Sequence, residues 1–82
     1  VLVPDSQRDK CLAGMQDKNI GVAVNYRAIH TLQWFRENFR YRPESFPVAH
    51  DIGNRTISLP FHLYLKDEEI AYVSSTLTDL LK

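Results

Sequence analysis

Residues 20–35 read IGVAVNYRAIHTLQWF, and the interpretation of the whole chain starts from this stretch. Its first residues alternate between larger aliphatic and small side chains, which is the period of a β-strand with one face pressed closely against a neighbour. Polar and aromatic groups then follow together, and a helical pattern comes after them. The stretch therefore predicts a strand over residues 20–26, a candidate binding edge where that strand ends, and a short helix.

Two other segments have strand character. Val-Leu-Val at residues 1–3 is followed by Pro4, and Thr-Ile-Ser-Leu at residues 56–59 is followed by Pro60. Proline cannot donate a backbone hydrogen bond, so each proline is expected to end its strand. The chain is thus predicted to hold three short strands.

Helical spacing is predicted in four segments. A helix is expected after Ser6, which is placed as an N-cap, and to end at residues 18–19. Its buried side should carry Cys11, Leu12 and Met15. Its exposed side should carry Arg8, Lys10, Gln16 and Asp17.

The other three helices are expected in the second half of the chain. Thr31 is placed to cap a helix whose apolar positions are Leu32, Phe35 and Phe39. Pro47 suits the first position of the next helix, and Gly53 should weaken that helix at its end. The last helix has carboxylates in its first turn, at residues 67–69, and an apolar face: Ile70, Val73, Leu77, Leu80 and Leu81.

The order of these elements predicts an α+β fold, a small mixed sheet with helices packed on one face. At 82 residues the chain is one domain with a small core and a thin stability margin. It opens on strand-like residues and has no initiator methionine, so we expect a piece of a longer chain.

Composition narrows the classes of partner. Ten basic residues balance ten acidic ones, so no overall field attracts nucleic acid or an anionic membrane. No apolar run approaches the roughly 18 residues of a membrane span. A lone cysteine, Cys11, favours a reducing, cytoplasmic compartment.

No catalytic or metal-binding motif is found. The histidines, His30, His50 and His62, have no partner at ligand spacing, and Cys11 lies on the expected buried face of a helix. The glycines are isolated, so no phosphate-binding loop is expected. We therefore predict no catalytic residue and no metal in this segment.

Arginine and aromatic side chains are interspersed between residues 26 and 42: Tyr26, Arg27, Trp34, Arg36, Arg40, Tyr41 and Arg42. They would suit an anionic or aromatic ligand. The alternative, favoured for the last three arginines, is a solvated surface with an aromatic anchor packed against another domain. Tyr26 and His30 lie at a strand end, where side chains face a cleft, and either binding or packing is open to them.

Several segments in order resemble the C-terminal domain of the DegT/StrS-type sugar-nucleotide aminotransferases, which use pyridoxal 5′-phosphate (PLP). They are residues 19–21, the strand to residue 26, His30, and residues 46–49, 58–60 and 67–73. Residues 26–31 are most similar to the family's UDP-4-amino-4-deoxy-arabinose aminotransferase of lipid A modification. The sequence departs from the family pattern at Asn25, where His is common, and at Lys66, where Thr is usual.

The resemblance implies that residues 1–82 are the small C-terminal domain of a fold-type I PLP enzyme. An upstream domain would bind PLP, glutamate would donate the amino group, and a nucleotide-linked keto-sugar would accept it. Asn25, Tyr26 and His30 would face that substrate. The full-length protein would be a cytoplasmic homodimer that binds neither nucleic acid nor membrane.

Two alternatives stay open. A PLP-dependent sugar dehydratase of the same family shares this domain and removes water instead of transferring an amine. A self-contained binding module would use the arginine and aromatic surface without enzymatic activity.

Overall fold

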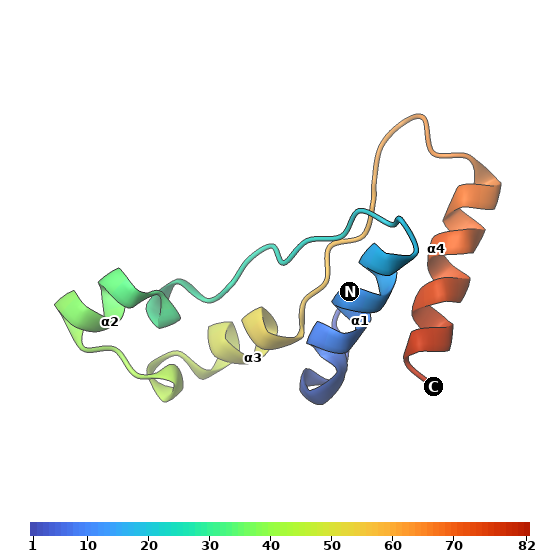
Figure 1. The fold of residues 1–82 in the computed structure, drawn as a ribbon. Helices are drawn as coiled ribbons and strands as arrows, with labels where there is room; N and C mark the ends of the chain where they lie inside the picture. The colour runs from blue at the N-terminus through green and yellow to red at the C-terminus, as the bar shows by residue number, and fades with distance from the viewer.

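A computed structural model describes all residues, 1–82, and helices dominate it (Figure 1). The α-helices are α1 (Asp5–Asp17), α2 (Gln33–Phe39), α3 (Pro47–Arg55) and α4 (Asp67–Leu80). Two single turns of 3₁₀-helix, η1 (Ile29–Thr31) and η2 (Pro43–Ser45), lie before and after α2. No helix combines the length and apolar character needed to cross a bilayer.

The predicted small mixed sheet, and with it the α+β class, is wrong. The three extended segments meet only at two isolated antiparallel pairs, Leu2 with Thr56 and Ala23 with Ser58. The second pair exchanges two backbone hydrogen bonds, of 3.2 and 2.8 Å. Pairing cannot continue beside Leu2, because Pro4 has no N–H and α1 begins at the next residue. The extended segments therefore connect helices and do not form a layer.

Helix α1 ends as predicted, at residues 18–19. Asn19 has a positive φ of 62°, and Ile20 N–H donates to the Met15 carbonyl at 3.0 Å. Asn19 N–H donates to Gln16 at 3.0 Å, so the helix ends in a Schellman motif. The predicted Ser6 cap is wrong, because α1 begins at Asp5 with no side-chain cap.

Helices α1 and α4 lie side by side and enclose the core with the extended segments (Figure 1). Gly14 lets them approach, since a Cβ there would stand 2.7 Å from Leu80 Cδ2. Val3, Cys11 and Ile57 form the buried centre. Half-buried side chains surround it: Leu12, Val22, Leu59, Leu77, Leu80 and Leu81.

Helix α4 follows the sequence prediction closely. Its first turn carries three carboxylates, and Glu69 Oε1 accepts a hydrogen bond of 2.9 Å from Lys66 N–H. Negative charge is favoured there by the helix dipole. The end of the helix brings Leu77 and Leu80 to the core, whereas Ile70 is half exposed.

Helices α2 and α3 extend to one side of the α1–α4 pair (Figure 1). The Cα trace accordingly measures 46 × 29 × 20 Å. Thr31 does not cap α2 as predicted: it lies in η1, its hydroxyl donates to the Ala28 carbonyl at 2.6 Å, and Leu32 precedes α2. Pro47 does occupy the first turn of α3. This extended part of the chain holds the largest group of aromatic side chains.

Candidate functional site

An open pocket of about 450 Å³ lies between residues 26–30 and α3. Most of its lining is apolar, and the lining residues are Tyr26, Arg27, Ala28, Ile29, His30, Phe35, Tyr41, Phe46, Ala49 and Ile52. Pockets of this size with apolar walls and few polar groups are typical small-molecule sites. We therefore take it as the candidate functional site.

Close backbone packing joins the two walls of the pocket. Gly53 is buried in α3, and a Cβ placed on it would lie 2.7 Å from the Ala28 backbone nitrogen and 3.4 Å from the Tyr26 carbonyl oxygen. Ala28 belongs to one wall, and Gly53 follows Ile52 of the other. A glycine is required at this point because any side chain would separate the walls.

Aromatic rings continue from the pocket toward α2. Phe46 contacts His30 with ring centroids 5.2 Å apart, and Tyr41 edge-on at 5.1 Å. Tyr41 stacks on Phe39 at 5.5 Å, and Phe39 contacts Trp34 at 5.8 Å. These separations are those of stabilising aromatic pairs. The aromatic cluster therefore starts in the pocket wall and continues beyond it to Phe39 and Trp34, and Trp34 is more than half exposed.

His30 is part of the pocket wall. Only 5% of it is exposed, and its Nε2 lies 3.0 Å from the Pro43 carbonyl oxygen. A carbonyl only accepts, so Nε2 is the donor in this contact. Because His30 belongs to η1 and Pro43 to η2, this contact holds the two turns together.

Tyr26 and Asn25 differ in their placement. Tyr26 is 79% exposed and lines the pocket, whereas Asn25 is exposed and does not belong to the lining. The structure thus brings Tyr26 and His30 to one pocket and leaves Asn25 beside it. Arg27 also lines the pocket, and the exposed Arg36, Arg40 and Arg42 lie outside it.

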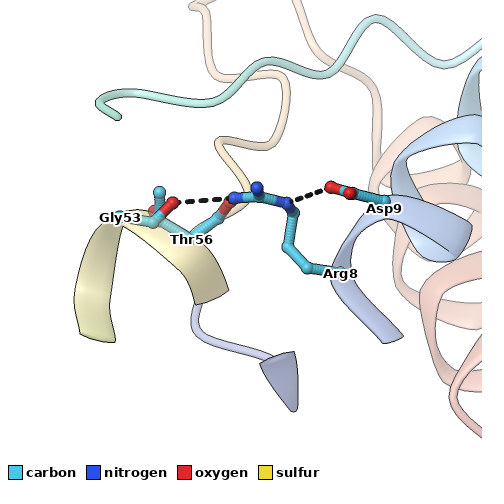
Figure 2. A network of polar contacts seen from close by, with 4 residues as sticks. All are labelled: Arg8, Asp9, Gly53 and Thr56. Atoms are coloured by element: carbon cyan, nitrogen blue, oxygen red, sulfur yellow. Dashed lines mark hydrogen bonds and ion pairs between the residues drawn. The ribbon is translucent and has the colours of Figure 1, made fainter. Parts of the chain in front are cut away.

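Arg8 is a residue that helical spacing placed on the solvent face. Its guanidinium instead reaches α3, where Nη1 donates to the Gly53 carbonyl at 2.8 Å (Figure 2). The signal available in the sequence was weak, since an arginine on an amphipathic helix is usually solvated.

No metal site is found: no three His, Cys, Asp or Glu side chains are grouped to hold an ion. The three histidines do not converge either, although His30 and His50 lie 6.1 Å apart between ring centroids. His50 Nε2 contacts the Asn54 amide at 3.2 Å, while its Nδ1 is buried without a partner.

Residues 1–78 match the sequence pattern of one protein family, the DegT/DnrJ/EryC1/StrS aminotransferase family. The chain belongs to this family. The spore coat polysaccharide biosynthesis protein SpsC of Bacillus subtilis (strain 168) is 28% identical over 76 residues, which cover 92% of this chain and 20% of SpsC. An uncharacterized protein of Methanocaldococcus jannaschii is 30% identical over 63 residues, 77% of this chain and 16% of that protein. No solved structure gives a significant match.

Family membership confirms the resemblance to DegT/StrS-type aminotransferases, while the narrower likeness to the amino-arabinose enzyme stays a prediction. The chain spans about one fifth of the length of the curated relatives that it matches.

Enzymes of the DegT/DnrJ/EryC1/StrS family generally use PLP, and the residues present here do not fit a PLP site. The pocket lining contains no lysine for a Schiff base and no carboxylate for the pyridine nitrogen. All four lysines, Lys10, Lys18, Lys66 and Lys82, are exposed. A lysine activated for catalysis needs a desolvated or cationic environment.

Proposed function

We propose that this chain is the C-terminal domain of a longer PLP-dependent aminotransferase, which transfers an amino group from glutamate to a nucleotide-linked keto-sugar. The observation that carries the proposal is the family match over residues 1–78. The small share of its relatives that the chain covers supports placing PLP and the catalytic lysine in another part of that protein. The longer protein is proposed to be a cytoplasmic homodimer.

The pocket beside His30 is proposed to hold part of the sugar nucleotide. Its apolar walls suit the face of a sugar or base ring, and the Tyr26 hydroxyl and the Arg27 guanidinium supply polar contacts at its edge. His30 supports the wall through Pro43 and Phe46. Asn25 is exposed beside Tyr26 and would contact the substrate from outside the pocket.

The product is proposed to serve cell-surface polysaccharide synthesis. SpsC is named for spore coat polysaccharide biosynthesis, which supports this class of product. The likeness of residues 26–31 to the amino-arabinose enzyme favours a lipid A precursor as the specific product.

The first test is made on the longer protein that carries this chain. Purified protein should show the absorbance of bound PLP and should convert glutamate to 2-oxoglutarate only when a UDP-linked 4-keto-sugar is present. Loss of water from the sugar without amine transfer would identify a dehydratase instead. If the reading frame that carries this chain encodes no PLP-binding domain, the self-contained binding module is the function that remains.

The second test concerns the pocket residues. His30→Ala and Tyr26→Ala should each raise the KM for the sugar nucleotide about fivefold or more, with a smaller change in the KM for glutamate, because the first weakens the wall of the pocket and the second removes a contact proposed for one substrate. Tyr64→Ala is the matched control, since Tyr64 is 86% exposed and does not line the pocket. Equal effects on both substrates would contradict the assignment.

A further inference from the structure

We propose that Arg8 is a positioning residue for the pocket. It holds the C-terminal end of α3 so that Gly53 stays against Ala28 and the two pocket walls keep their spacing. The kinetic part of this inference rests on the proposed function, whereas its structural part does not.

The Arg8 side chain spans the gap between α1 and α3 (Figure 2). Nη1 donates to the Gly53 carbonyl at 2.8 Å and lies 3.4 Å from the Thr56 carbonyl oxygen, while Nε donates to Asp9 Oδ1 at 2.7 Å. Only 15% of the side chain is exposed, against 89% for that of Asp9. The contact with α3 is thus the sheltered one, and the ion pair faces solvent.

The Gly53 carbonyl needs this donor. In a continuing helix it would accept from the N–H four residues on, which belongs to Ile57. That N–H instead donates to the Val1 carbonyl at 2.9 Å, and the last helical bond of α3 is the one from Thr56 to Ile52. Arg8 therefore satisfies a carbonyl that the helix end leaves open, and its positive charge complements the negative end of the helix dipole.

The contact also restrains one wall of the pocket relative to the other. Ile52 and Ala49 of α3 line one side, and the backbone of Ala28 runs along the other. Gly53 is the point where these walls touch, with no room for a Cβ. The hydrogen bond from the Arg8 guanidinium to the Gly53 carbonyl therefore holds α3 at the point that sets the width of the pocket.

Arginine suits this role better than lysine. Its rigid fork offers several N–H donors in one plane, so two carbonyls and a carboxylate are reached together. A lysine ammonium would reach one carbonyl and leave α3 more mobile. The mobility of α3 should therefore increase from wild type to Arg8→Lys and again to Arg8→Gln.

The test uses the longer protein with Arg8→Gln, Arg8→Lys and Asp9→Asn. Hydrogen exchange is followed at Thr31 and Leu32, whose amides donate to Ala28 and Ile29 at 3.0 Å. Arg8→Gln should speed their exchange about tenfold relative to α4 and raise the KM for the sugar nucleotide by a similar factor, with kcat changed less than about twofold. Arg8→Lys should give a smaller change of the same kind.

Asp9→Asn is the matched control, because it removes the exposed charge and leaves the carbonyl contacts in place. It should match wild type in exchange and in kinetics. The inference is overturned if Thr31 and Leu32 exchange at the wild-type rate in both Arg8 variants, or if exchange rises equally in α4. An equal rise in the KM of both substrates also overturns it. Absence of amine transfer in the wild type would refute the proposed function, and the exchange data would still decide the role of Arg8.

Discussion

Gly53 presses the end of α3 onto the backbone of Ala28, with 2.7 Å between the Ala28 nitrogen and the place a Cβ would take. A glycine inside a helix normally costs about 1 kcal/mol relative to alanine, through the entropy lost on folding. Here that cost is offset because only glycine allows the two walls of the pocket to meet.

Gly53→Ala is expected to lower the free energy of unfolding by about 1–3 kcal/mol, because the added methyl group meets backbone atoms that cannot move aside. Urea denaturation of the 82-residue chain, followed by circular dichroism, measures the change. Gly14→Ala is the control: its Cβ would meet the flexible end of Leu80, so the change should be smaller. Equal stability of the Gly53→Ala variant and wild type would contradict the packing described.

Cys11 is expected to be inert in the folded protein. The side chain is fully buried, so the thiol is not accessible to attack. An aromatic disulfide reagent should react with it slowly under native conditions and rapidly in urea. Cys11→Ser should lower the free energy of unfolding by about 1–3 kcal/mol, since it buries a hydroxyl in an apolar site. Rapid labelling of the native chain would show that α1 does not cover the core.

Asn19 is expected to tolerate glycine but not alanine. Its φ of 62° is left-handed, a conformation that asparagine adopts with little strain and glycine with none. Asn19→Ala should lower the free energy of unfolding by about 1 kcal/mol, and Asn19→Gly should leave it unchanged or raise it. Thermal unfolding of both variants measures this difference. The same loss in both would mean that α1 does not end in the Schellman motif.

Local features of the fold were predictable from the sequence. The acidic first turn of α4, the turn at residues 18–19 and Pro47 in α3 each act through nearby backbone groups, and the structure confirms these elements. The burial of Cys11 and Met15 also followed from helical spacing. Such features need no knowledge of what lies elsewhere in the chain.

The sheet was not predictable, because pairing depends on segments far apart in sequence. Residues 22–24 and 56–58 have the composition of strands, yet they meet at a single residue pair. Of the predicted site residues, Tyr26 and His30 line one pocket, where His30 is buried in the wall and Tyr26 is exposed. Their proposed contact with a substrate stays a prediction.

The sequence by itself determined the helices, the turn that ends α1 and the family, because each depends on residues close together along the chain or on their order. Only the tertiary structure decided that Arg8 serves α3 and that Gly53 is a contact point for Ala28, since both roles join residues that lie far apart along the chain. The physical reason is that a helix end leaves carbonyl groups open, and only the folded chain decides which donor reaches them.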